Sequence, residues 1–95
     1  MTVYFLNCAT IGNPEGMAEY RRGVGPILKK YGCRILAADL SFELIEGVWD
    51  GDSMVVIEAP DGDAIKQLLA SDEYATLKAL RQSSSMTNAI IVKGR

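Results

Sequence analysis

The chain alternates short apolar runs with longer stretches in which apolar residues recur every three or four positions. Residues 3–9 form the first apolar run, and their β-branched and aromatic side chains predict a strand. Between residues 17 and 31 the apolar positions follow the spacing of one face of an amphipathic helix. Asn13 and Pro14 are typical of its start, and Gly32 is typical of its end.

Pro26 lies inside this predicted helix, close to Gly23 and Gly25. Proline has no amide hydrogen to donate to the carbonyl four residues earlier, which is that of Arg22. We therefore expect a kink or a restart of the helix at this point. The glycines favour close packing of the helix on a sheet. A phosphate-binding loop is the alternative, but the G-x-G-x-x-G spacing is absent.

The middle of the chain predicts a β-hairpin. Residues 33–46 contain a second strand, whose alternation slips around Ala37 to Asp39 and so indicates a bulge. Asp50-Gly51 is a strong signal for a two-residue turn, because glycine readily adopts a positive φ. Residues 54–59 then form the returning strand.

The last third predicts a second helical region and a final strand. Asp61 caps a helix that carries Ile65 and Leu68, and Ser71 is a second cap, so two helical segments meet near residue 70. Residues 88–92 form the last strand. The order β-α-β-β-α-β is the split βαβ or ferredoxin-like arrangement of an α+β domain. It predicts one domain over residues 1–95, with a four-stranded antiparallel sheet and two helices on one face.

The strands have apolar residues at consecutive positions, which a half-exposed sheet does not need. Residues 3–6, 54–57 and 89–92 are apolar on both faces of the predicted sheet. Two helices cover only one face, and a large apolar face left open marks a partner site. We therefore expect a homodimer with the sheets packed face to face. A monomer with a hydrophobic open face is the alternative.

The composition of the chain excludes several kinds of catalytic site, metal site and partner. The chain has 95 residues, 48% of them hydrophobic, a net charge of −2 and no histidine. The charge argues against a nucleic-acid partner, and the missing histidine excludes Ser-His-Asp and Cys-His catalysis and histidine-bound zinc. No apolar run approaches the length of a membrane span, and the first residues lack the basic region of a signal peptide, so we expect a cytoplasmic protein without a membrane partner.

An acidic stretch runs from Asp39 to Asp63, with no Lys or Arg between Arg34 and Lys66. A metal site at the acidic turn over residues 50–52 is conceivable, but the further acids of a calcium loop are missing. A solvated turn explains the acids better, and we expect no metal and no cofactor.

Polar residues within apolar patterns are the candidate binding groups. Asn7 and Glu58 each interrupt an apolar strand, and a carboxylate in a packed strand must be paired, solvated or in a pocket. With aromatic and cationic groups of the helices, they form a candidate ligand site of Asn7, Tyr20, Glu58, Tyr74 and Arg81. A structural ion pair for Glu58, core packing for the tyrosines and a helix-end role for Arg81 are the alternatives.

Trp49 stands apart from this set, at the end of the predicted hairpin. We expect it either to reach across to a second copy of the chain or to pack within its own protomer.

Several short sequence motifs follow one another in an order that is typical of one protein family. They are Pro14-Glu15-Gly16, Tyr20-Arg21-Arg22-Gly23-Val24-Gly25-Pro26, Lys30-Tyr31-Gly32, Glu46-Gly47 with Trp49, Val55-Val56-Ile57-Glu58-Ala59-Pro60, and Ser71-Asp72-Glu73-Tyr74 with Lys78-Ala79-Leu80-Arg81. Together they resemble a small bacterial family called domain of unknown function 1330, within the dimeric α+β barrel superfamily. The resemblance covers nearly the whole chain. It implies a ferredoxin-like protomer and a face-to-face dimer, but no reaction.

Two departures from that family concern the expected cavity. Leu68-Leu69 stands where relatives usually carry an aromatic pair, and Ala59 stands where they usually carry phenylalanine. Both make the side chains smaller, so a pocket here differs in shape from that of relatives.

The sequence thus favours a small homodimeric protein that binds a small organic ligand in a pocket between sheet and helices. Superfamily relatives include monooxygenases and isomerases of small, often aromatic compounds, so a cofactor-independent enzyme of this kind is the first alternative. A purely structural or protein-binding dimer is the second.

Overall fold

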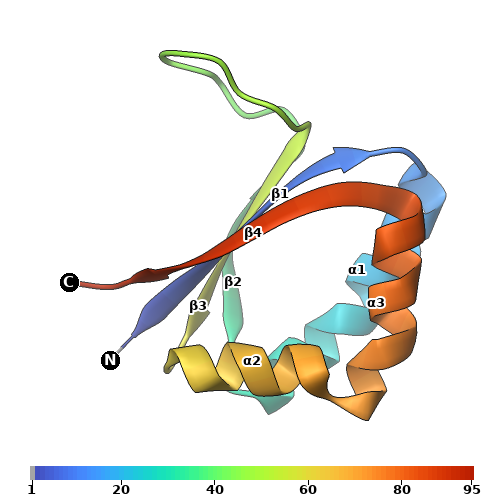
Figure 1. Ribbon diagram of the computed structural model, residues 1–95, viewed down its shortest axis with the longest axis vertical. Helices are drawn as coiled ribbons and strands as arrows, with labels where there is room; N and C mark the ends of the chain where they lie inside the picture. Colours follow the sequence, from blue (N-terminus) through green and yellow to red (C-terminus); the bar gives the residue numbers. More distant parts are fainter. Residues whose placement is uncertain (1) are drawn as a thin grey trace.

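The computed structural model describes residues 2–95 and has an antiparallel sheet with helices on one face (Figure 1). Its strands are β1 (Val3–Ile11), β2 (Arg34–Asp39), β3 (Ser53–Ala59) and β4 (Ser85–Lys93), in the order β2-β3-β1-β4. Its helices are α1 (Pro14–Lys30), α2 (Gly62–Ala70) and α3 (Asp72–Ser84). The predicted ferredoxin-like α+β fold is confirmed, with the second helical region divided in two.

Helix α1 begins as the sequence predicts. The side-chain oxygen of Asn13 accepts the amide of Gly16 at 3.2 Å, and Pro14 occupies the first turn. Gly32 follows the helix with a φ of +76°, which a residue with a Cβ adopts at a cost. The expected restart at Pro26 is wrong, because α1 runs through it to Lys30. One missing hydrogen bond is tolerated where the buried face of the helix keeps its packing.

The second helical region is interrupted at Ser71, as predicted. Asp61 caps α2, since its carboxylate accepts the amide of Ala64 at 2.8 Å. The expected side-chain cap at Ser71 is wrong: its hydroxyl donates to the carbonyl of Leu68 at 2.7 Å, at the end of α2. The extended backbone of Ser71 separates the two helices and changes the direction of the chain between them (Figure 1).

The predicted hairpin at Asp50-Gly51 is wrong. Strand β2 ends at Asp39, which pairs with Met54, so β3 has only Ser53 left opposite positions 40–46. The amide of Asp52 donates instead to the carbonyl of Ala9 on β1, at 2.7 Å. Residues 40–52 therefore form a long connecting loop that projects from the sheet (Figure 1). The expected bulge is present, as a register shift between Ile35 and Ala37.

The two faces of the sheet have different surroundings. Side chains alternate between faces along a strand, and the buried Phe5 and Ile57 lie on the face that the helices cover. The opposite face, which we call the open face, has no helix against it (Figure 1). The pairing register places on the open face the apolar residues Tyr4, Leu6, Cys8, Met54, Val56, Met86, Ile90 and Val92. The predicted two-sided apolar character of the strands is therefore confirmed.

Helices α1 and α3 approach closely at two glycines. A Cβ at Gly16 would collide with the hydroxyl of Ser84, and a Cβ at Gly23 would lie 2.7 Å from a methyl carbon of Leu77. The carbonyl of Ser84 accepts the amides of Gly12 and Asn13, each at 2.9 Å. These contacts join the start of α1 to the end of α3. Within residues 2–95, none of the helices has the length and apolarity that a bilayer crossing requires.

Replacing Gly16 with alanine tests this close approach. Because the added methyl group would meet the buried Ser84, we expect Gly16→Ala to lower the free energy of unfolding by about 1–3 kcal/mol. Gly62→Ala is the matched control, since open space surrounds that position, and it should leave stability unchanged or slightly raised. Chemical denaturation measures both. Equal stability of the two variants would contradict the role given to Gly16.

Candidate functional site

A cavity of about 130 Å³, which we call the inner cavity, lies between the covered face of the sheet and the helices. Its floor comes from alternate residues of β1 and β3, including Phe5, Asn7 and Val55. Its walls come from α1, α2 and α3, and most of its lining is apolar. The polar and charged residues that line it are Asn7, Tyr20, Arg21, Ser53, Tyr74, Arg81 and Thr87.

Two tyrosines meet at the wall of this cavity. Tyr20 comes from α1 and Tyr74 from α3, and their hydroxyl oxygens are 2.8 Å apart. Their rings pack edge to face, with centroids 6.3 Å apart. Arg81 lies about two helical turns after Tyr74, and its Nε donates to the Tyr74 hydroxyl at 3.3 Å. The three side chains therefore form one hydrogen-bonded chain across α1 and α3.

The hydrogen bonds that join Tyr20, Tyr74 and Arg81 leave one hydroxyl hydrogen of the two tyrosines unused. A guanidinium group only donates, so the oxygen of Tyr74 is the acceptor of the bond from Arg81. The two tyrosines share a single hydrogen bond but carry two hydroxyl hydrogens. Whichever tyrosine donates to the other, one phenolic hydrogen stays free for a further acceptor.

Burial keeps Tyr20 in its neutral form. Removal of the phenol from water is the largest cause that raises its pKa far above the ordinary value, and the hydrogen bond with Tyr74 raises it further. The positive charge of Arg81 acts in the opposite direction but is outweighed. At neutral pH Tyr20 is consequently a hydrogen-bond donor or acceptor and is unsuited to act as a base.

Asn7 contributes a polar group that the protein itself does not satisfy. Its Nδ2 atom is buried and has no hydrogen-bond partner. A buried donor without a partner costs about 1–3 kcal/mol. Asn7 also lines the inner cavity, so the missing partner is one that an occupant of the cavity can provide.

A second, more open space of about 350 Å³, which we call the outer hollow, adjoins the inner cavity towards β4. Ala89, Ile90 and Ile91 of β4 line it. Five residues border both spaces and form the boundary between them: Phe5, Asn7, Leu69, Tyr74 and Arg81. Three of the polar or charged residues of the site, Asn7, Tyr74 and Arg81, therefore lie where the two spaces meet.

The charge at this boundary is positive. Arg21 and Arg81 line the inner cavity, and among the described residues that line either space none is Asp or Glu. Arg81 is half-buried and Arg21 is exposed. Over residues 2–95 there is no group of three or more His, Cys, Asp or Glu side chains arranged to hold a metal ion.

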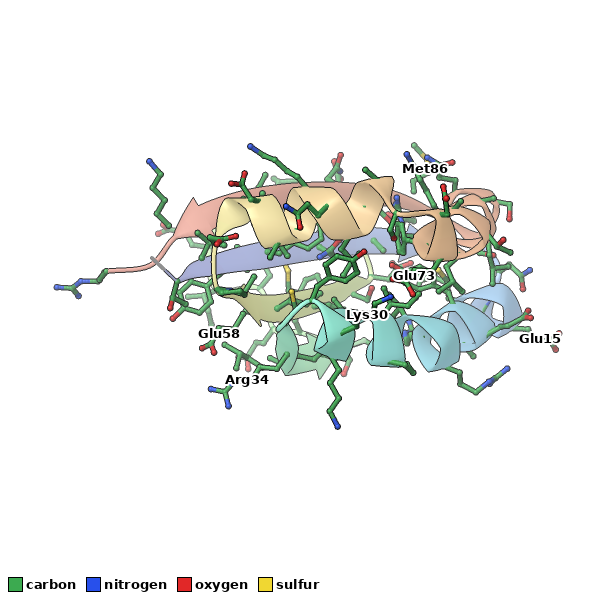
Figure 2. The ribbon with its side chains drawn as sticks, turned by 90° about the horizontal axis from the view of Figure 1, so that it is seen from below. Glu15, Lys30, Arg34, Glu58, Glu73 and Met86 are labelled. Atoms are coloured by element: carbon green, nitrogen blue, oxygen red, sulfur yellow. The ribbon has the colours of Figure 1, made fainter. Side chains whose placement is uncertain are left out.

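The structure brings together four of the five predicted ligand-site residues and separates the fifth. Asn7, Tyr20, Tyr74 and Arg81 line the inner cavity. The expectation that Glu58 shares this pocket with Arg81 is wrong, because Glu58 pairs with Tyr4 on the open face. Its Oε1 accepts a hydrogen bond from Arg34 Nε at 3.1 Å, and Figure 2 shows the two side chains together at the edge of the molecule. This is the structural ion pair given above as the alternative.

Trp49 lies outside the cavity, at the end of the projecting loop. Its indole Nε1 donates to the sulfur of Cys8 on the open face at 3.1 Å, and its ring packs edge to face on Phe42. About half of its surface remains exposed (52%). Trp49 thus holds the loop against the open face and still presents apolar surface outward.

Sequence reasoning missed several cavity residues, including Phe5, Arg21, Val55 and Leu69. Phe5 lies two residues from Asn7, so the strand period alone places both on one face. Leu69 and Arg21 carried no such signal, because the positions of helices over a sheet depend on tertiary packing.

The buried hydrogen bond of Tyr20 predicts a dependence of stability on pH. Its raised pKa means that the folded protein holds the phenolic proton more tightly than the unfolded chain does. This contribution to stability is fully present below the ordinary value of 10.0 and is lost as the pH rises above it. We therefore expect Tyr20→Phe to lose less stability than the wild type between neutral and strongly alkaline pH.

Urea denaturation at a series of pH values measures this difference. Burial also raises the pKa of the Cys33 thiol and so acts in the same direction, but Cys33 is present in both proteins and cancels in the comparison. Identical alkaline losses in the two proteins would contradict the assignment.

Comparison with solved structures supports the fold. A protein of unknown function from Rhodopseudomonas palustris, RPA0582, is 19% identical with a TM-score of 0.84, over 99% of this chain and 82% of that one. SnoaB, a cofactor-independent oxygenase from Streptomyces nogalater, is 18% identical with a TM-score of 0.72, over 99% of this chain and 93% of that one. An antibiotic biosynthesis monooxygenase is 19% identical with a TM-score of 0.61, over 100% of this chain and 99% of that one. These likenesses establish the α+β fold of the chain.

Sequence comparison gives the family. No curated protein matches the chain at a significant level. The family model described as domain of unknown function (DUF1330) matches residues 2–95. The resemblance seen in the motifs is thereby confirmed, and the chain belongs to the DUF1330 family.

Proposed function

We propose that this protein binds a small, mainly apolar organic molecule in the inner cavity. The observation that carries the proposal is that Asn7 lines the inner cavity while its buried Nδ2 has no hydrogen-bond partner among residues 2–95. A hydrogen-bond acceptor on a ligand would remove the cost of leaving this donor unsatisfied. The free phenolic hydrogen of the tyrosine pair is a second donor, carried by one of two residues that line the inner cavity.

The size of the site supports a compact ligand. Cavities of about 150 Å³ with apolar walls accommodate a single benzene ring. The inner cavity, at about 130 Å³, therefore suits one ring or a group of similar size. Any larger part of the ligand would extend past Asn7 and Tyr74 into the outer hollow.

Filling the cavity tests this proposal. Val55 lines the inner cavity, so we expect Val55→Phe to occupy part of its volume and to weaken binding of single-ring compounds by about tenfold or more. Benzene, phenol and acetophenone are suitable probes, measured by ligand-observed NMR. Val56→Phe is the matched control, because the neighbouring side chain lies on the open face. Failure of every probe to bind the wild type, or equal binding to both variants, would contradict the proposal.

A cofactor-independent oxygenase is the second candidate, favoured by the structural likeness to SnoaB. Such chemistry needs a substrate anion that gives electrons to oxygen, and the donors at the cavity boundary suit a developing oxyanion. It also needs a base, and the described cavity lining offers no Asp or Glu, while Tyr20 is held neutral. Binding therefore comes first in the proposal. Oxygen uptake in the presence of a bound phenol would favour the enzyme.

We also propose that the protein forms a homodimer through the open face. The open face is continuous with the projecting loop, whose exposed residues Leu40, Leu44, Ile45, Val48 and Trp49 add to its apolar surface. Contiguous apolar surface of this kind marks an association site. A second copy fits it best, because an isologous dimer covers the open face and the loop of both copies at once. Trp49 would then contact the partner.

A charge on the open face tests the dimer. Ile90 is 58% exposed in the single protomer, so Ile90→Glu should leave folding nearly unchanged. In a face-to-face dimer the same carboxylate would be buried without a partner, and we expect the dissociation constant to rise about a hundredfold or more. Analytical ultracentrifugation measures it. Ala75→Glu, on an exposed position of α3, is the control. A wild-type protein that is monomeric at micromolar concentration would contradict the proposal.

A further inference from the structure

The unpaired charge of Arg81 indicates which polar group the ligand carries. The ion pairs over residues 2–95 are Lys30 with Glu73 and Arg34 with Glu58, so no carboxylate of the protein neutralises Arg81. Figure 2 shows that Lys30 and Glu73 meet on the outer side of the helices, whereas Arg81 borders both the inner cavity and the outer hollow. A half-buried cation without a partner beside an apolar cavity favours an anionic occupant.

The hydrogen bonds of Arg81 define how it presents this charge. Its Nε is engaged by the hydroxyl oxygen of Tyr74. That bond fixes the plane of the guanidinium and leaves both terminal nitrogens, with four hydrogens, to other acceptors. Two parallel N–H groups, one on each terminal nitrogen, can donate to the two oxygens of a carboxylate. A neutral carbonyl or hydroxyl would use only one of them and leave the charge uncompensated.

The arrangement of the two spaces gives the orientation of such a ligand. The inner cavity is mainly apolar and has room for about one ring, while Arg81 lies at its boundary with the more open outer hollow. We propose that the ligand is a monocarboxylic acid with a compact, preferably aromatic, body, held with the body in the inner cavity and the carboxylate at Arg81. This inference rests on the proposed function and names its ligand class.

Arg21 is the competing cation. It also lines the inner cavity, but it is exposed on α1 and borders the inner cavity only. No hydrogen bond orients its guanidinium within the site, whereas Arg81 is oriented by Tyr74. Charge held in a fixed direction and half removed from water interacts more strongly with an anion than an exposed charge does. The site thus assigns recognition of the carboxylate to Arg81.

A pair of compounds of equal shape tests the inference in the wild-type protein. Phenylacetate and phenylacetamide have nearly the same shape, but the acid presents two charged acceptor oxygens where the amide presents one neutral oxygen and an NH2 group, and isothermal titration calorimetry gives their affinities. We expect phenylacetate to bind at least about tenfold more tightly. Arg81→Gln should abolish this preference, and Arg81→Lys should retain part of it, because a lysine keeps the charge but not the planar fork. Arg22→Gln, at an exposed position outside both spaces, is the matched control and should keep the preference, and Arg21→Gln tests the competing cation.

The possible outcomes separate recognition of a carboxylate by Arg81 from ligand binding in the inner cavity, on which it rests. Equal affinity of the wild type for the acid and the amide would contradict the proposal that the ligand carries a carboxylate. The proposal of a cavity that binds small organic molecules would then stand without it. Loss of the preference in Arg21→Gln but not in Arg81→Gln would overturn the assignment to Arg81. If neither compound binds and single-ring hydrocarbons do not bind either, the proposed function fails as well. Because the acid and the amide are first compared on the wild type, the test does not depend on the folding of a variant.

Discussion

The contact between the start of α1 and the end of α3 determines where the functional groups of this protein lie. Gly16 and Ser84 approach so closely that a single methyl group would separate the helices, and the Ser84 carbonyl binds the amides that precede α1. Tyr20 lies about one helical turn after Gly16. Its hydroxyl bonds to that of Tyr74, which lies in the first turn of α3. The tyrosine pair in turn orients Arg81. The same two helices that pack closely at Gly16 and Ser84 thus also carry the hydrogen-bonding side chains of the site.

The sheet explains why the molecule has two different candidate surfaces. Helices cover one face, but the break at Ser71 and the spread between α3 and β4 leave space beneath them, which becomes the inner cavity and the outer hollow. The other face has no cover within the protomer and is extended by the projecting loop. The high hydrophobic fraction of a short chain is therefore divided between a ligand-sized cavity and a partner-sized surface. Val55 lines the inner cavity, whereas the adjacent Val56 lies on the open face.

Local chemistry made most of the fold predictable, and the failures occurred where pairing partners decide the outcome. Asn13, Asp61 and Gly32 determine helix ends through bonds within a few residues, so the sequence identified them correctly. Residues 40–46 have strand-like composition, but β3 is too short to pair with them. For the site, both faces of each strand are apolar, so the pattern did not reveal that Asn7 and Glu58 point in opposite directions. The ion pair that Glu58 forms with Arg34, outside the cavity, follows from that difference.

The central position of β1 in the sheet bears on how the molecule is made. Its residue Val3 pairs with Lys93, so one neighbour of the first strand to be synthesised is the last. On the ribosome, β1 must wait with an unsatisfied edge and an apolar surface until β4 has emerged, because contacts this distant in sequence form late. The outer hollow, which β4 borders, is completed in the same step. The pairing of β1 with β4 thus links completion of the sheet to completion of the outer hollow.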